Sequence, residues 1–174
     1  MKSYEEHRNA AKDDVKISII TVSSSKYQEI NSGKKVDDKS GEIIKDMIEK
    51  AGYQIISKNI IDDNIKMIRL QLFNDIHTKN ADVVILTGGT GISNRDVTVE
   101  SIRPLFDKEL EGFGEIFRNI SFKQIGSPSH LSRATAGVIS NRLVYCLPGS
   151  PNAIKPALDI ILPELPHALS MTKK

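Results

Sequence analysis

The chain is poor in cysteine and aromatic residues and has no long apolar run. One of its 174 residues is cysteine, none is tryptophan, and 5% are aromatic. A single cysteine excludes an internal disulfide and thiol-based zinc sites, and the histidines lack metal-ligand spacing. Cys146 itself lies in the apolar run 143–147, so we interpret it as a small buried hydrophobe. No apolar stretch approaches ~20 residues, and the polar N-terminus predicts neither a signal peptide nor a membrane span. We therefore expect a cytoplasmic protein.

An excess of one charge is also lacking. The chain has 24 basic and 22 acidic residues, which gives a net charge of +2. Because the charges are so evenly balanced, they give no electrostatic signal for binding nucleic acid or a membrane, and we expect neither as a partner. Hydrophobic residues make up 39% of the sequence, which is enough for one domain with its own core. We expect a flexible polar tail at residues 1–14 and a single domain at residues 15–174.

Apolar strands and amphipathic helices alternate along the chain. Strand patterns occupy residues 16–23, 53–61, 83–86, 134–139 and 143–147, with a turn at residues 141–142 between the last two. Helical spacing occupies residues 43–51, 65–76, 98–103, 112–124 and 151–170, whereas residues 23–40 read as a polar loop. This alternation predicts a three-layer α/β/α sandwich with a mostly parallel sheet. The strand pair at 134–147 gives the sheet a short antiparallel edge.

A glycine-rich turn follows the strand at residues 83–86. Residues 87–91 read Thr-Gly-Gly-Thr-Gly, and glycines let backbone N–H groups approach an anion closely. Ser93 adds a hydroxyl, Arg95 adds a forked cation, and Asp96 can hold a Mg²⁺ that bridges phosphates. The turn is not a Walker A loop, because Ile92 stands where that loop has lysine. We interpret it as a phosphate site with its own metal ligand; the alternative is a tight turn without a ligand.

Three further loops leave the carboxyl ends of predicted strands, where ligands bind in sheets of this kind. They span residues 23–40, 61–64 and 148–152. In the last, Ser150 and Pro151 predict a helix start, which is either a second anion site or a plain capped helix.

Five blocks of the chain, in order, resemble the MoaB/MogA family of molybdenum-cofactor biosynthesis proteins. They read TGGTG at 87–91, RDVT followed by Glu100 at 95–100, EGFGE with Arg118 at 111–118, SRATAG at 132–137 and LPGSP at 147–151. The match runs from about residue 16 to the last helix. Residues 112–118, 121–126 and 132–134 are more similar to the MoaB branch.

The resemblance implies a homotrimer that binds molybdopterin, a dithiolene pterin carrying one phosphate. Active members use Mg²⁺ and ATP to attach AMP to that phosphate, and they release pyrophosphate. The implied activity is therefore molybdopterin adenylyltransferase, and the alternative is a non-catalytic molybdopterin-binding carrier or scaffold on the same fold. The choice between molybdenum and tungsten, and pairing of trimers into hexamers, stay open. Transient contact with other cofactor-biosynthesis enzymes is a further expectation.

The resemblance also implies roles for single residues. Asp96 and Asp63 become the catalytic acids and metal ligands, although Asp63 has the alternative role of capping the following helix. Substrate and phosphate binding is assigned to Thr87, Gly88, Gly89, Thr90, Gly91, Ser93, Arg95, Ser24, Ser25, Ser40, Gly41, Ser132, Arg133, Gly149, Ser150 and Pro151.

Several of these assignments have a plain structural alternative. Ser24 stands where the family usually has an acid, and Lys26 takes the basic role there. Ser40 and Gly41 also suit a solvated helix start. Arg118 and Lys155 are, like Arg133, candidate phosphate contacts, and the alternative for each of the three is an exposed charge on a helix or strand.

Two phenylalanines in the fourth helical segment lie one helical turn apart. Phe113 and Phe117 share a face, so we expect at least one to be buried, either at a subunit contact or in the intrachain core.

Overall fold

The computed structural model describes residues 15–173, which form a six-stranded sheet in the order β2-β1-β3-β6-β5-β4. The tail that we predict at residues 1–14 lies outside the described residues. The parallel strands are β1 (Lys16–Val22), β2 (Gln54–Ile61), β3 (Val83–Thr87) and β6 (Arg142–Leu147). An antiparallel edge follows, made of β5 (Thr135–Ile139) and β4 (Lys108–Glu109). The predicted mixed sheet is confirmed.

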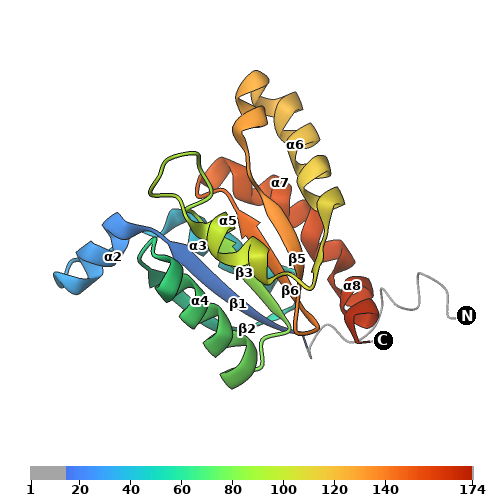
Figure 1. Ribbon diagram of the computed structural model, residues 1–174, viewed down its shortest axis with the longest axis horizontal. Helices are drawn as coiled ribbons and strands as arrows, with labels where there is room; N and C mark the ends of the chain where they lie inside the picture. Colours follow the sequence, from blue (N-terminus) through green and yellow to red (C-terminus); the bar gives the residue numbers. More distant parts are fainter. Residues whose placement is uncertain (1–14, 174) are drawn as a thin grey trace, which may run out of the picture.

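Helices cover both faces of the sheet (Figure 1). One face carries α4 (Ile65–Phe73), the π-helical η2 (Asn74–Thr78) and α5 (Thr98–Ile102). The other face carries α3 (Lys39–Lys50), α6 (Glu111–Ile125), α7 (Pro151–Ile161) and α8 (Leu165–Thr172). Short 3₁₀ segments are η3 (Arg103–Leu105), η4 (Ser127–Leu131) and η5 (Leu162–Glu164). None of the helices within residues 15–173 has the length and apolar character needed to cross a bilayer.

The central strands supply side chains to two separate cores. Ile17 and Ile19 of β1 point into the core under α3 and α7, whereas Ile20 and Val22 point into the core under α4. A strand that is buried on both faces needs apolar residues at successive positions, which explains the near-continuous apolar runs in the sequence. Cys146 is fully buried in β6, and burial raises the pKa of its thiol. Its interpretation as a core residue is confirmed.

Two elements differ from the sequence prediction. Helix α2 (Ser24–Asn31) occupies part of the segment that we predicted as a polar loop. It buries no residue and projects from the body of the fold (Figure 1), so it shows no amphipathic period for a sequence pattern to detect. Strand β4 has two residues, too few for an alternating pattern.

Turn and helix boundaries also shift. In the β5–β6 hairpin, Ser140 and Asn141 adopt left-handed φ values of 50° and 61°, so the turn precedes Arg142 rather than including it. The last predicted helix is interrupted at η5, which contains Pro163, while Pro156 is accommodated inside α7. Proline removes a backbone donor, and this accounts for the break.

Phe113 and Phe117 lie in the intrachain core. Their side chains are 7% and 1% exposed, and their rings stack with centroids 6.2 Å apart. Phe113 also meets Tyr145 of β6 edge-on, with centroids 5.3 Å apart. Of the two alternatives, burial within the chain is the one that the structure confirms.

Phe117→Ala should lower the free energy of unfolding by ~3–5 kcal/mol, because it removes a fully buried aromatic ring and leaves a cavity. Phe122→Ala on the same helix is the matched control. Phe122 is 61% exposed, so its loss should change stability by no more than ~0.5 kcal/mol. Denaturant titration of both variants measures the difference, and equal effects would contradict this placement of α6.

Candidate functional site

The loops that follow β3 and β6 lie side by side at the carboxyl edge of the sheet. Gly88 N donates to Leu147 O at 3.1 Å, and Thr87 Oγ1 donates to Pro148 O at 2.9 Å. Ser40, at the start of α3, donates from Oγ to Gly149 O at 2.7 Å. Three segments far apart in sequence therefore meet at one point, as predicted for ligand-binding loops of such a sheet.

The residues between β3 and α5, which we call the glycine-rich loop (residues 88–97), need glycine at two positions. Gly88 and Gly89 have φ values of +98° and +61°. A Cβ on Gly88 would lie 2.2 Å from Val22 O, and one on Gly89 would lie 2.7 Å from both carboxylate oxygens of Asp63. Thr98 fixes the turn, because its N donates to Gly89 O and its Oγ1 to Gly88 O, both at 2.9 Å. The loop thus lies against β1 and against Asp63.

Asp63 contacts the glycine-rich loop and does not cap α4. Its Oδ1 accepts a hydrogen bond from Val97 N at 3.2 Å, and its own N donates to Ser24 Oγ at 3.4 Å. The N-cap of α4 is Asn64, whose side chain accepts from Lys66 N and Met67 N. The capping alternative for Asp63 is therefore wrong.

Asp96 closes the other end of the loop. Its Oδ2 accepts from Ser93 N at 3.0 Å, and its N donates to Ser93 O at 2.9 Å. A Cβ on Gly91 would lie 2.7 Å from the same Oδ2, so the carboxylate covers the glycine closely. Arg95 N donates to Ser93 Oγ at 3.3 Å, and both residues are exposed.

Several carboxylates lie near the glycine-rich loop. Burial raises the pKa of the Asp63 carboxyl, and the nearby charges of Asp96, Asp62 and Glu100 raise it further against the hydrogen bond from Val97. Within residues 15–173, no lysine or arginine forms an ion pair with Asp63 or Asp96. The arrangement favours a cation supplied with the ligand.

These oxygens fit Mg²⁺ as part of a shared site. Mg²⁺ is usually held by one or two carboxylates together with substrate phosphates, rather than by an all-protein cage. The described part of the chain has no cluster of three or more acidic, histidine or cysteine side chains suited to a metal. Asp63 and Asp96 would supply the protein ligands, and a phosphate would supply the rest.

Arg133 holds the glycine-rich loop. Its Nε donates to Thr90 O at 3.2 Å, its Nη2 donates to Asp96 O at 3.4 Å, and its guanidinium forms an ion pair with Glu100. The hydrogen bond from Arg133 lowers the pKa of Glu100. These contacts within the protein engage all three guanidinium nitrogens. They do not test the predicted phosphate contact of Arg133, which stays a prediction.

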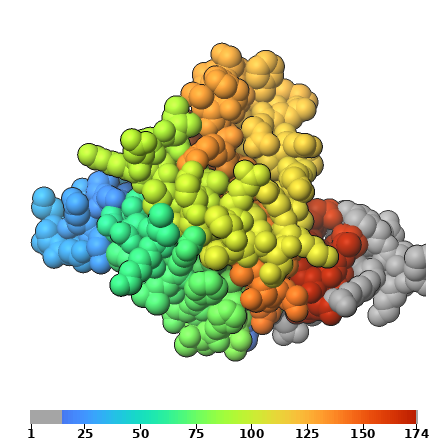
Figure 2. All heavy atoms as spheres, in the orientation of Figure 1, coloured from blue at the N-terminus to red at the C-terminus, as the bar shows by residue number. Residues whose placement is uncertain are grey.

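A cavity of about 410 Å³, which we call the site cavity, lies beside the glycine-rich loop. Its volume is within the range usual for small-molecule sites. Apolar side chains from α6 and η4 form one wall, among them Phe117, Ile125 and Leu131. The loops after β3 and β6 contribute backbone and polar side chains to the lining, from Gly88, Gly89, Thr90, Gly91, Asp96, Gly149 and Ser150. In Figure 2 the loop projects as a yellow-green surface next to the orange tip of α6 and η4. The site cavity suits a ligand with an apolar ring at one end and an anion at the other.

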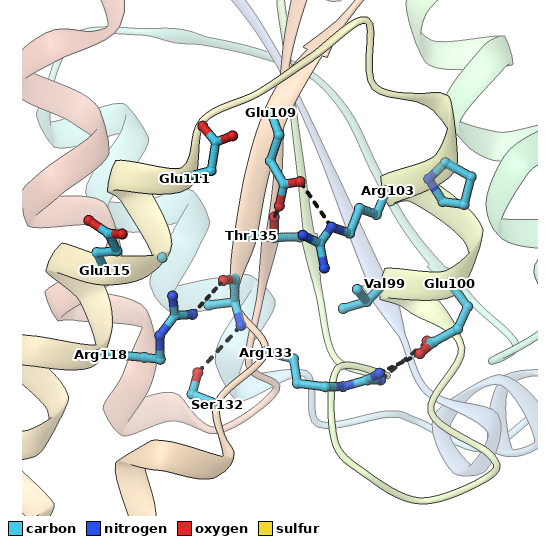
Figure 3. Close-up of a pocket in the computed structure, with 13 residues that line it drawn as sticks. Val99, Glu100, Arg103, Glu109, Glu111, Glu115, Arg118, Ser132, Arg133 and Thr135 are labelled. Atoms are coloured by element: carbon cyan, nitrogen blue, oxygen red, sulfur yellow. Dashed lines mark hydrogen bonds and ion pairs between the residues drawn. The ribbon is translucent and has the colours of Figure 1, made fainter.

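A larger cavity of about 790 Å³, the charged cavity, lies between α5 and α6 (Figure 3). Its charged side chains largely satisfy each other or the backbone. Arg103 pairs with Glu109, Arg133 pairs with Glu100, and Arg118 Nη1 donates to the carbonyl of Ala134 at 3.4 Å. Neither candidate acid nor any glycine of residues 88–91 lines it. We therefore place the candidate site in the smaller cavity.

The structure brings most of the predicted site residues together. Ser132 lines both cavities described above, and Ser40 and Thr87 line a small cavity next to the site cavity. Ser150 is the N-cap of α7 without a side-chain capping bond, and Pro151 begins that helix as predicted. Eight predicted residues lie in exposed positions, namely Ser25, Gly91, Ser93, Arg95, Gly149, Ser150, Pro151 and Lys155.

Sequence reasoning missed the role of Asp38. It is 5% exposed, caps α3, and accepts hydrogen bonds from Gly41 N and Thr21 Oγ1. Asp37 next to it is exposed, and nothing in the pair Asp-Asp tells which one is buried. The sequence signal that could have found this role is the preference for Asp at helix N-caps, because Asp38 lies two residues before Ser40 at a predicted helix start.

The architecture is that of a three-layer α/β domain with a glycine-rich, acid-bearing loop at the carboxyl edge of its sheet. The family model described as "Probable molybdopterin binding domain" matches residues 18–167. Molybdenum cofactor biosynthesis protein B of Bacillus subtilis is 42% identical, over 99% of this chain and 98% of that protein. Molybdopterin adenylyltransferase of Pyrococcus furiosus is 43% identical, over 98% of each chain.

Solved structures agree with the sequence relatives. The crystal structure of the tungsten cofactor synthesizing protein MoaB from Pyrococcus furiosus matches with a TM-score of 0.83 and 42% identity. The match covers 95% of this chain and 100% of the other chain. The chain belongs to the MoaB/MogA family of molybdopterin-binding domains.

Asp63→Asn should raise the free energy of unfolding at neutral pH. The raised pKa means that the folded state holds the proton more tightly than the unfolded state does. The resulting loss of stability sets in as pH rises through the ordinary value of 3.8 and is complete above the raised pKa. Denaturant titrations at about pH 3 and about pH 7 should show a larger gain at the higher pH. Asp159→Asn, at an exposed position, is the control; an equal gain there would refute the argument.

Arg133→Gln should loosen the glycine-rich loop. Hydrogen bonds to charged groups are worth ~1.5–3 kcal/mol, so amide exchange at Ser93, Asp96 and Thr98 should speed up by roughly 10-fold or more. Arg103→Gln is the control, since Arg103 lines the same charged cavity but pairs with Glu109. Hydrogen-exchange mass spectrometry over residues 88–98 measures the effect. Unchanged exchange in Arg133→Gln would show that the loop is held by other contacts.

Proposed function

We propose that the protein is a molybdopterin adenylyltransferase, which transfers AMP from ATP to the phosphate of molybdopterin with the aid of Mg²⁺. The name of the Pyrococcus furiosus relative supports the activity, because that protein is similar to this chain over nearly its whole length. The names of the Bacillus subtilis relative and of the matching family support a place in molybdenum-cofactor biosynthesis. Family resemblance also supports a homotrimer acting in the cytoplasm.

The chemistry joins two anions. An oxygen of the molybdopterin phosphate attacks the α-phosphorus of ATP, and the bond from that phosphorus to the bridging oxygen of pyrophosphate breaks. Catalysis of this kind depends on alignment and on neutralising charge. Mg²⁺, when bound, would supply positive charge to the phosphates. Asp63 and Asp96 would hold it, the backbone of residues 88–91 would receive a phosphate, and the apolar wall of the site cavity would receive the pterin ring.

One observation carries the proposal. Two carboxylates, Asp63 and Asp96, lie against Gly89 and Gly91 of the same loop, and neither has a basic partner within residues 15–173. Such an arrangement repels an anion unless a cation comes with it. A protein that only carried the pterin would bind its phosphate better without these two charges. The acids therefore favour the enzyme over the carrier.

The decisive experiment is incubation of the purified protein with molybdopterin, Mg²⁺ and ATP labelled at the α-phosphate. The proposal predicts labelled adenylylated pterin and an equal amount of pyrophosphate. Binding of molybdopterin without any product would identify the protein as a carrier.

Asp96→Asn should reduce the rate of AMP transfer by at least ~10²-fold, the scale for losing one well-placed electrostatic group. Molybdopterin binding should survive, because the amide keeps the size of the carboxyl and still accepts from Ser93 N. Asp63→Asn should also reduce the rate, since the capping role that could have spared it is excluded. Asp159→Asn serves as the charge-matched control. Turnover of Asp96→Asn at the wild-type rate would contradict the assignment of the metal ligand.

A further inference from the structure

A third cavity, of about 120 Å³, lies between the glycine-rich loop and the end of β1; we call it the lysine cavity. It is formed by the ends of β1 and β3, the first turn of α2, the start of α3 and the loop after β6. Its lining residues are Thr21, Val22, Ser23, Lys26, Ser40, Thr87, Gly88 and Gly149. Lys26 is the one charged side chain among them. Hydroxyl groups, backbone and one ammonium group make this a lining for an anion.

The ammonium group of Lys26 is held in place by Asp38. Its Nζ lies 3.1 Å from Asp38 Oδ1, and the side chain is 26% exposed. Asp38 is itself fixed, because its carboxylate accepts from Thr21 Oγ1 at 2.9 Å and from Gly41 N at 3.3 Å. Burial raises the pKa of Asp38, but the hydrogen bonds from Thr21 and Lys26 outweigh it, so the pKa is lowered. Asp38 does not line the cavity, so a ligand there would contact the ammonium group of Lys26 and not the carboxylate of Asp38.

The lysine cavity adjoins the site cavity. Gly88 and Gly149 line both of them, so these two glycines form a boundary that the two cavities share. The volume of the lysine cavity equals that of about four waters, which is too small for a pterin or a nucleoside. Sites for molecules of that size usually occupy ~300 Å³ or more. A single phosphoryl group is the anion that fits.

We propose that Lys26 binds a phosphoryl group of the pyrophosphate portion of the nucleotide. The inference rests on the proposed function, and it names the place of the leaving group. When the bond between the α-phosphorus and the bridging oxygen breaks, its electron pair remains on pyrophosphate. A lysine ammonium acts as a point charge for phosphate and stabilises that oxygen anion without any proton transfer.

The chain offers a matched control in Lys58. Lys58 Nζ lies 3.7 Å from the other oxygen of Asp38 and also pairs with Glu42, but Lys58 does not line the lysine cavity. Lys26→Met and Lys58→Met each remove one ammonium group from the same carboxylate. Only Lys26→Met removes positive charge from the cavity.

The experiment is titration calorimetry of the full chain with inorganic pyrophosphate and Mg²⁺. Lys26→Met should weaken pyrophosphate binding by roughly 10-fold or more, the scale of one charged hydrogen bond, and Lys26→Arg should restore part of it. Lys58→Met should leave the affinity within about 3-fold of the wild type, and molybdopterin affinity should be unchanged in all variants.

Several results would overturn the proposal. These are wild-type protein that does not bind pyrophosphate, unchanged affinity in Lys26→Met, or equal losses in Lys26→Met and Lys58→Met, which would trace the effect to Asp38. The titration needs no turnover, so it separates this inference from the proposed activity. If AMP transfer were absent while Lys26→Met alone weakened pyrophosphate binding, the subsite would stand and the activity would fall.

Discussion

The close approach of Gly88 to β1 is the constraint on which the site depends. A Cβ at this position would lie 2.2 Å from Val22 O, so only glycine lets the loop after β3 lie against the neighbouring strand. From there the loop passes Asp63 at Gly89 and reaches the loop after β6 through the hydrogen bond from Gly88 N to Leu147 O. Three parallel strands are thereby joined at their carboxyl ends.

This arrangement places like charges together, which costs stability and serves binding. Asp63 and Asp96 approach the same turn, and each is held by a backbone N–H group rather than by a cation. The free protein gains nothing from their mutual repulsion. In the proposed function, a ligand that brings both phosphate and Mg²⁺ would relieve this repulsion, which would favour that combination over an anion alone.

Positive charge is distributed differently. Arg133 donates to the backbone of the glycine-rich loop and pairs with Glu100. Lys26, in contrast, lines the lysine cavity, and its counterion Asp38 is buried. Arginine suits the first task because its planar fork can bond several oxygens at fixed angles. Lysine suits the second, where a compact point charge meets a phosphate. A single positive charge therefore has a structural role at Arg133 and a proposed ligand-binding role at Lys26.

The sequence by itself determined the mixed α/β sheet, the glycine-rich loop and the family, because apolar periodicity and ordered motifs are local properties of the chain. It gave no sign of α2, which buries no residue, and it left the role of Asp63 open between capping and metal binding. Only the tertiary structure decided that Asn64 caps α4, that Phe113 and Phe117 pack within the chain, and that Asp38 is the buried member of its pair. The cap is a local contact, but the packing of the two rings and the burial of Asp38 depend on segments distant in sequence. In all three cases burial and hydrogen-bond geometry, rather than residue type, fix what a side chain does.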